Sequence, residues 1–122
     1  SPYLQYTYAR LNNILIKAGS ENHKAQDVSY ELLKHETEMC LIKHLLNFSE
    51  VVQESREELA PQQLALYIYE LAVAANRFYE EVRVLEDDNK ERRNARLMLV
   101  ETTAAILKRG LNLLGIETLD RI

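Results

Sequence analysis

The sequence predicts an all-α protein, an antiparallel bundle of about five helices. Apolar residues recur at intervals of three and four over long segments, and no segment alternates apolar and polar residues as a half-buried strand does. The composition agrees, with 47% hydrophobic and 28% charged residues but only three glycines and two prolines. With 122 residues, the chain is expected to form one domain, residues 1–122, around one core.

The first helix is expected from Pro2 to Ala18, with Gly19 as its C-terminal cap. At about 100° per residue, its core face contains Leu4, Tyr8, Leu11, Leu15 and Ala18. The opposite face carries Tyr6, Arg10, Asn13 and Lys17, with Tyr3 at its edge. Two interpretations stay open for these planar and cationic groups: they bind a flat or anionic ligand, or they pack against a second helix.

A polar loop follows at residues 20–28, and helical patterning returns at residues 29–34. The next helix, within residues 35–48, is expected to bury Met39, Ile42, Leu45 and Leu46. Ser49 then caps a short acidic helix over residues 50–59.

Pro61 is suited to open a central helix that reaches residue 85. Its buried stripe is expected to be Leu64, Ile68, Leu71, Ala75, Phe78 and Val82, widened by Tyr67 and Ala74. Tyr69 and Tyr79 are also assigned to the core, because aromatic residues at helical spacing usually pack there. One of Asp87, Asp88 and Asn89 caps the final helix, which ends at Gly115 and buries Leu97, Val100, Ala104, Leu107, Leu111 and Leu114.

The charge pattern excludes some classes of partner. A net charge of −4 argues against a wholly basic surface that would grip DNA or other nucleic acid non-specifically. Residues 1–19 nevertheless contain no acid, and the acidic excess lies between residues 20 and 82, so the two ends form a basic surface if they meet in the fold. The sequence has no membrane span, no signal peptide and a single cysteine, which together predict a cytoplasmic protein with no membrane partner.

Catalytic motifs are missing from the sequence. It contains no glycine-rich phosphate loop, HExxH, GxSxG or CxxC, so no catalytic residue is expected. Glu36, Cys40 and His44 share a helix face, but they extend over two turns and cannot all surround one ion. We therefore expect no metal site.

Three segments, in this order, carry a family resemblance: PYLQYTYARL at residues 2–11, LALYIYELAVAANRFYEEVRVL at 64–85, and ARLMLVETTAAILKRGLNLLGIETLDRI at 95–122. Together they resemble the C-terminal, DALR-type anticodon-binding domain of arginyl-tRNA synthetases. The resemblance implies the C-terminal part of a class I synthetase, whose catalytic domain lies upstream in the same chain and uses ATP and Mg²⁺. Because HIGH and KMSKS motifs are missing here, this part alone is expected to hold no cofactor and to catalyse nothing.

The resemblance also implies a partner, the anticodon stem-loop of arginine tRNA, and a set of RNA-binding residues. Arginine codons have G in the middle, so the central anticodon base is cytosine. Tyr6 and Arg10 are implied to face the anticodon loop, and Arg10 can donate to cytosine O2 or N3. Asn13 and Lys17 extend this row, and Arg121 and Ile122 approach the anticodon. Arg83 is included for contact with phosphates of the loop or stem, but for Arg83, Arg92, Arg93 and Arg96 phosphate contact and simple solvation at a helix end both stay open.

Three residues depart from the family pattern. Tyr8 stands where histidine is usual and is assigned to the core, Ser49 stands where proline is usual, and Ile122 replaces the usual methionine. Two other functions are considered: a protein-docking module that keeps the fold without RNA recognition, as the acidic middle of the chain suggests, and the related domain of a cysteinyl synthetase. The segments QYTYAR and NRFY favour arginine.

Overall fold

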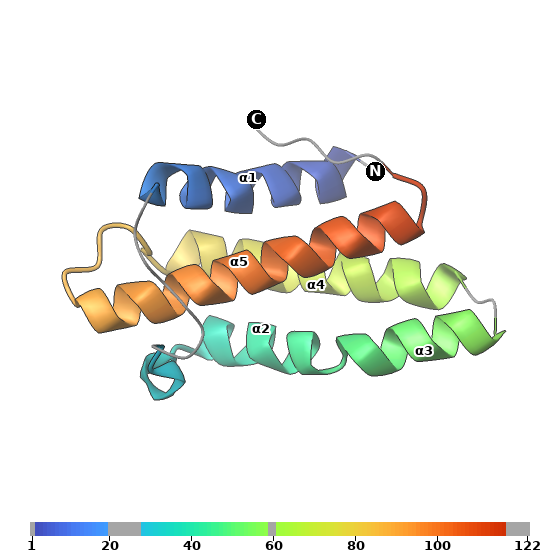
Figure 1. Cartoon of the computed structure of the whole chain (residues 1–122), viewed down its shortest axis with the longest axis horizontal. Coiled ribbons are helices and arrows are strands. Elements are labelled where there is room, and N and C mark those ends of the chain that lie inside the picture. Colours follow the sequence, from blue (N-terminus) through green and yellow to red (C-terminus); the bar gives the residue numbers. More distant parts are fainter. Residues whose placement is uncertain (1, 20–27, 59–60, 117–122) are drawn as a thin grey trace.

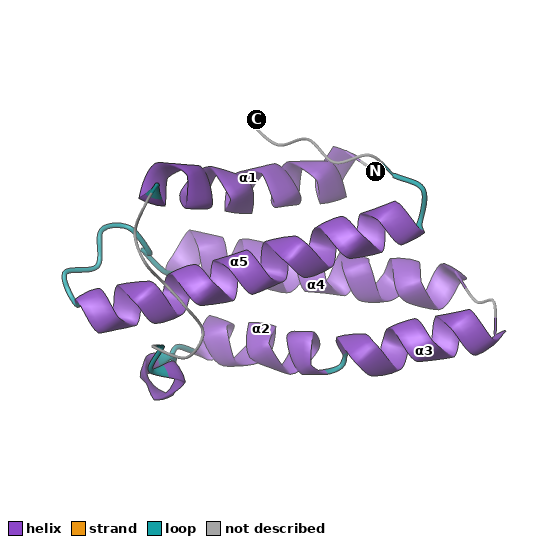
Figure 2. Ribbon diagram, viewed as in Figure 1, coloured by secondary structure: helices purple, strands orange, loops and turns teal. Residues whose placement is uncertain are grey.

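The computed structural model describes residues 2–19, 28–58 and 61–116, with the backbone alone for residues 54–58. The order of elements is α1 (Pro2–Ala18), a 3-10 helix η2 (Tyr30–Leu32), α2 (Glu36–Leu46), α3 (Phe48–Glu58), α4 (Pro61–Glu81) and α5 (Lys90–Leu113). Helices joined by short loops make up this described part of the chain, which contains no strand (Figure 2). The predicted all-α fold is confirmed.

Helix α4 lies at the centre of the bundle and contacts α1, α2, α3 and α5. Helices α2 and α3 follow one another along one side of it and run opposite to α4, and α5 also runs opposite to α4 (Figure 1). Helix α1 packs against both α4 and α5. The first and last helices therefore meet, as the charge pattern required for a joint surface. Within the described ranges, no helix is both long enough and apolar enough to cross a membrane.

Local signals explain where the helices begin and end. Gly19 and Gly115, with φ of 62° and 77°, take up the left-handed conformation after α1 and α5. Of the three candidate caps for α5, Asn89 is the one used, since its side chain accepts a bond from the backbone N–H of Arg92. The α2 cap is His35, whose side chain accepts from Thr37 N–H while the Glu38 side chain accepts from His35 N–H.

The apolar stripes of α4 and α5 form the core largely as predicted. All eight residues expected on the α4 stripe are buried, and on α5 only Leu114 is partly exposed. Tyr8 is 6% exposed, which confirms its assignment to the core. Helices α4 and α5 approach each other closely at Gly110, where an added Cβ would lie 2.1 Å from Ile68 Cδ1. Glycine at this position lets the two helices approach each other.

The predicted stripe of α2 is wrong in two of its four residues. Met39 and Leu46 are 53% and 77% exposed, whereas Leu41 is completely buried. The inward face of α2 also contains Glu38, which is buried because it pairs with Arg96 of α5. A helix whose inward face contains a paired carboxylate cannot be oriented from its apolar residues alone.

Two helix boundaries also differ from the predictions. Ser49 does not cap α3, because helical bonding begins earlier: Val51 N–H donates to the Asn47 carbonyl oxygen at 3.1 Å, and α3 starts at Phe48. Helix α4 ends at Glu81 instead of residue 85, although Val82 and Val84 beyond its end remain buried. Burial in this segment therefore continues after the helix has stopped.

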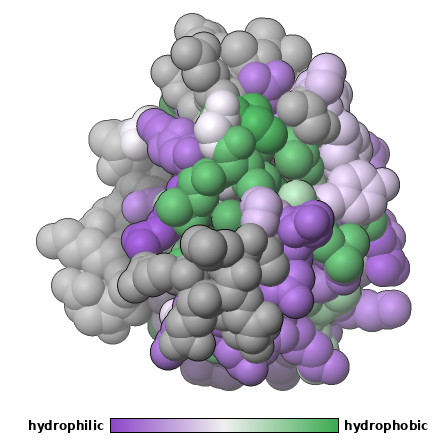
Figure 3. Space-filling model, turned by 90° about the vertical axis from the view of Figure 1, so that its right-hand side faces the viewer, coloured by the Kyte–Doolittle hydropathy of each residue, from purple (hydrophilic) through white to green (hydrophobic). Residues whose placement is uncertain are grey.

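Hydrophobic side chains gather on the end of the bundle where α1 begins and α5 ends (Figure 3). Ile116, shortly after the end of α5, packs against the core, and its N–H donates to the Leu111 carbonyl oxygen at 2.8 Å. The chain after α5 therefore returns onto the bundle at Ile116. Arg121 and Ile122 lie outside the described residues.

Candidate nucleic-acid interface

Four tyrosines are exposed where α1 packs on α4. Tyr3 and Tyr6 of α1 are 39% and 45% exposed, and Tyr69 and Tyr79 of α4 are 52% and 36% exposed. The rings of Tyr3 and Tyr69 lie 5.6 Å apart. We call these four residues the tyrosine surface. The core assignment of Tyr69 and Tyr79 is wrong, since their neighbours Ile68 and Phe78 fill the core and helical geometry turns the next residue outward.

Arg10 lies beside Tyr6 and Tyr79 of this surface and is held there by residues of α4. Its Nη1 donates to Asn76 Oδ1 at 3.0 Å and its Nη2 to Glu80 Oε1 at 2.7 Å. The guanidinium carbon lies 3.8 Å from the ring centroid of Tyr79 and 5.3 Å from that of Tyr6, which are cation–π distances. Burial disfavours the charged guanidinium, but the bond to Glu80 helps to outweigh it and raises the pKa of Arg10 above its ordinary value.

Asn76 is the residue that ties α1 to α4 beneath the tyrosines. Its amide nitrogen donates to Tyr3 Oη at 3.1 Å and to Thr7 Oγ1 at 2.7 Å, while its amide oxygen accepts from Arg10. Thr7 is fully buried. The sequence predictions did not include Asn76, although asparagine in the middle of a helix is unfavourable and so indicates a specific partner.

A hollow of about 260 Å³ lies beside Tyr79, between the end of α1 and the segment after α4. Its lining includes Lys17 of α1 and Glu80 and Arg83 from the α4 side. The Arg83 side chain is 83% exposed, and its Nη1 lies 3.9 Å from Glu86 Oε2. We call this feature the Lys17–Arg83 hollow. Because it shares Tyr79 and Glu80 with the Arg10 site, cationic groups and stacking groups lie next to each other.

The predicted RNA-binding residues therefore fall into three groups. Tyr6, Arg10, Lys17 and Arg83 are brought to one side of the molecule by α1 and α4. Asn13 is half-buried on α1. Arg121 and Ile122 lie outside the described residues. For Arg10, the packing interpretation holds in part, since its side chain is only 15% exposed and pairs with Glu80. The donation of a hydrogen bond from Arg10 to a base stays a prediction.

Arg92, Arg93 and Arg96 form ion pairs and hydrogen bonds with Asp87. Arg92 Nε pairs with Asp87 Oδ2 at 2.6 Å, and Arg93 Nη1 donates to the Asp87 carbonyl oxygen at 2.8 Å. Arg96 pairs with both Asp87 and the buried Glu38, at 3.0 and 2.8 Å. The bond from Arg92 lowers the pKa of Asp87 to about 2. Arg96 Nη1 also lies 3.3 Å from the Arg83 carbonyl oxygen, so this network supports the hollow.

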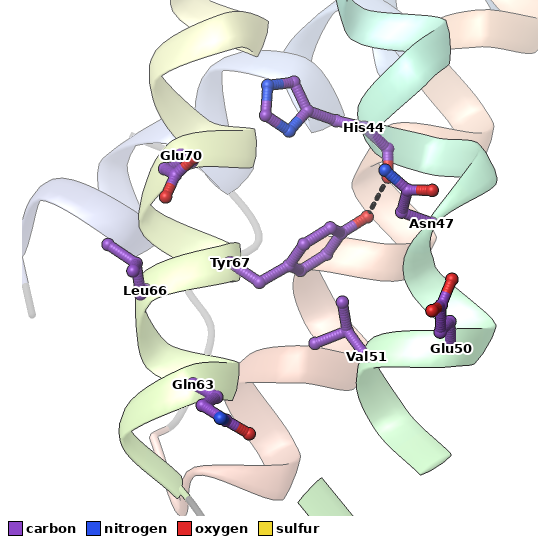
Figure 4. A pocket seen from close by; sticks show the side chains of 8 residues that line it. All are labelled: His44, Asn47, Glu50, Val51, Gln63, Leu66, Tyr67 and Glu70. Carbon is purple, nitrogen blue, oxygen red and sulfur yellow. Dashed lines mark hydrogen bonds between the residues drawn. The ribbon is translucent and has the colours of Figure 1, made fainter. Parts of the chain in front are cut away.

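A second hollow, of about 450 Å³, lies on the other side of α4, against the α2–α3 junction (Figure 4). Tyr67 extends across it and donates its hydroxyl to the His44 carbonyl oxygen at the end of α2. Burial raises the pKa of Tyr67 to about 12. The described residues that line this hollow include Glu50 and Glu70 and no lysine or arginine. Among these described residues, none carries the permanent positive charge that would neutralise a phosphate.

The α1–α4 side has the chemistry of a site for single-stranded nucleic acid. Exposed rings offer stacking surfaces, an oriented guanidinium and carboxylate offer a donor and an acceptor, and nearby cations can neutralise phosphates. Across the described ranges, no group of three histidine, cysteine, aspartate or glutamate residues is arranged to hold a metal ion.

Comparison with known proteins agrees with this chemistry. The family model of the DALR anticodon binding domain matches residues 4–122. The chain belongs to this family. The DALR domain is similar over its whole length to arginine–tRNA ligases: it is 40% identical to the enzyme of Nostoc punctiforme and 43% to that of Streptomyces coelicolor, and covers 20% of each.

Solved structures give the same result. The DALR domain superposes on the arginyl-tRNA synthetase of Thermus thermophilus with a TM-score of 0.83 and 34% identity, over 99% of this chain and 21% of that one. With the Plasmodium falciparum synthetase, the TM-score is 0.80 at 28% identity, over 98% of this chain and 21% of that one. The family resemblance seen in the sequence is confirmed, and the domain spans about one fifth of these relatives.

Proposed function

We propose that this DALR domain is the anticodon-binding module of an arginyl-tRNA synthetase. It recognises the anticodon loop of arginine tRNA, chiefly the central cytosine, and supports ATP- and Mg²⁺-dependent arginylation by a catalytic domain upstream in the same chain, in the cytoplasm. The observation that carries the proposal is the tyrosine surface around the oriented Arg10, in a chain of the DALR family.

The geometry of the site suggests which residues contact a base and which contact phosphates. A base turned out of the loop stacks on Tyr6 or Tyr79, whose ring centroids lie 5.3 and 3.8 Å from the Arg10 guanidinium carbon. Lys17 and Arg83 neutralise phosphates beside it, with Asn13 near them on α1. Arg121 and Ile122 complete the set proposed from the family pattern.

A protein-docking module is the less favoured function. The acidic middle of the chain suggested it, but the exposed aromatic and cationic groups lie together on the α1–α4 side, where nucleic acid is the better ligand.

The test is a binding titration with two RNA stem-loops. The chain is titrated with an arginine anticodon stem-loop and with one whose central cytosine is replaced by uracil. We expect the uracil stem-loop to bind more weakly by about 1–3 kcal/mol. Equal affinities in moderate salt would rule out recognition of that base.

Two tyrosine variants test whether the RNA binds at the tyrosine surface. Tyr6→Ala should weaken binding of the cytosine stem-loop, whereas Tyr30→Ala should not. Tyr30 is a suitable control because it is 47% exposed, like Tyr6, but lies on η2, outside the tyrosine surface.

A further inference from the structure

A carboxylate within the proposed RNA site needs an explanation. Glu80 is 65% exposed, lines the Lys17–Arg83 hollow and lies 2.7 Å from the Arg10 guanidinium. A carboxylate repels phosphate, and its pairing with Arg10 leaves the two groups with no net charge. The Arg10 site is therefore suited to a neutral ligand with hydrogen-bond donors and acceptors, whereas the phosphates belong at Lys17 and Arg83.

We propose that Glu80 is a specificity-determining residue, whose carboxylate accepts a hydrogen bond from the exocyclic amine of the central cytosine while Arg10 donates to the cytosine ring. This inference rests on the proposed function and adds a residue to it. Carboxylates accept from cytosine N4, and guanidinium groups donate to base acceptors.

The order of donors and acceptors decides which bases fit. Cytosine presents an amine donor beside the N3 acceptor, matching an acceptor from Glu80 beside a donor from Arg10. Uracil has the same size but presents the O4 acceptor beside the N3–H donor. Its O4 would therefore face a carboxylate oxygen of Glu80, and two acceptors cannot form a hydrogen bond. Adenine shares the cytosine order, so Glu80 is assigned the discrimination between the two pyrimidines.

The pair is oriented before any RNA arrives. Two of the five N–H donors of Arg10 bond to Asn76 and Glu80, and the Tyr79 ring lies against the guanidinium. The Glu80 carboxylate has further lone pairs beyond the one that accepts from Arg10. Groups that are already positioned lose less side-chain entropy on binding, which strengthens the contact.

The experiment compares Glu80→Gln with Glu81→Gln. Glu81 is the next residue, is exposed and ends α4, so the two variants remove the same charge at nearly the same place. Affinities for the cytosine and uracil stem-loops are measured at one salt concentration. In Glu80→Gln we expect the preference for cytosine over uracil to fall about 10-fold, because an amide can donate to uracil O4. Glu81→Gln should keep the wild-type preference, although both variants bind both RNAs somewhat more tightly.

A further variant separates the loss of base recognition from the loss of negative charge at residue 80. Glu80→Ala should weaken the preference by losing affinity for the cytosine stem-loop, since alanine offers neither donor nor acceptor. Circular dichroism confirms that each variant is folded. A folded Glu80→Gln protein with unchanged preference would overturn the role of Glu80 and leave the proposed function standing. A wild-type chain without any preference would overturn both.

Discussion

The two sides of α4 each carry a tyrosine beside a hollow, but the two tyrosines differ in burial and in the groups that they contact. Tyr67, facing α2 and α3, is buried and its hydroxyl is committed to the His44 carbonyl oxygen. Tyr79, facing α1, is 36% exposed, and its ring lies against a guanidinium. Two glutamates line each hollow, and the lining of the hollow beside Tyr79 adds the cations Lys17 and Arg83. An aromatic residue indicates a binding surface only when its face is open and cations lie nearby.

The largest expected effect tests this contrast directly. Tyr79→Ala should weaken binding of the cytosine stem-loop by about 1–3 kcal/mol, because a stacking ring is lost. The measurement is a fluorescence titration, with circular dichroism to show that the bundle is intact. Unchanged affinity in a folded variant would mean that the exposed ring of Tyr79 does not contact RNA.

Acid should weaken the ion pairs of Asp87, which support the Lys17–Arg83 hollow, and so lower the stability of the fold. The pKa of Asp87 is lowered to about 2, so its ion pairs stabilise the fold above its ordinary pKa of 3.8 and are lost as the pH falls through about 2. The stabilisation at neutral pH is about 2 kcal/mol, at 1.36 kcal/mol per pKa unit. Urea unfolding of the wild type and Asp87→Asn between pH 7 and pH 2 measures it. The variant should be less stable at pH 7, and the two proteins should converge toward pH 2; a constant difference would contradict this role.

Tyr67→Phe should affect stability and leave RNA binding alone. Removing the hydroxyl leaves the His44 carbonyl oxygen without this partner, so we expect a loss of about 1 kcal/mol in the free energy of unfolding. Affinity for the stem-loop should match that of the wild type. If RNA binding weakened as much as in Tyr79→Ala, the two sides of α4 would not differ as described.

The smallest effects are expected from the two cations of the hollow. Lys17→Ala and Arg83→Ala should weaken binding of the cytosine and uracil stem-loops equally, and each should lower the salt dependence by about one phosphate contact. Titrations at several salt concentrations give both quantities. A variant that changed the preference between the bases would place that residue at the base instead of at a phosphate.

The successes and failures of sequence prediction have different physical causes. The stripes of α4 and α5 could be predicted because apolar spacing reflects burial against several neighbours at once. The stripe of α2 could not, because Glu38 is buried through its pair with Arg96, 58 residues away. Tyr69 and Tyr79 were misassigned for a related reason: the width of the covered face depends on where α1 packs, which local periodicity does not reveal.

The candidate site was predictable on α1 and much less so on α4. Tyr6 and Arg10 could be identified from the polar face of α1 together with the family pattern. The contacts of Asn76 and Glu80 with Arg10 could not be predicted, because they span 66 and 70 residues of sequence, although a mid-helix asparagine does indicate some specific partner. Hydrogen bonds between residues so far apart produce no periodic pattern in the sequence.

Mapping the RNA on the protein by NMR tests whether it binds on the α1–α4 side. Isotope-labelled protein is titrated with the cytosine stem-loop, and backbone amide shifts are followed. We expect the largest changes on α1 and α4, around Tyr6, Arg10 and Tyr79 and around the Lys17–Arg83 hollow. Changes centred on Tyr67 and the α2–α3 junction, with none at Tyr6 or Tyr79, would contradict binding on the α1–α4 side.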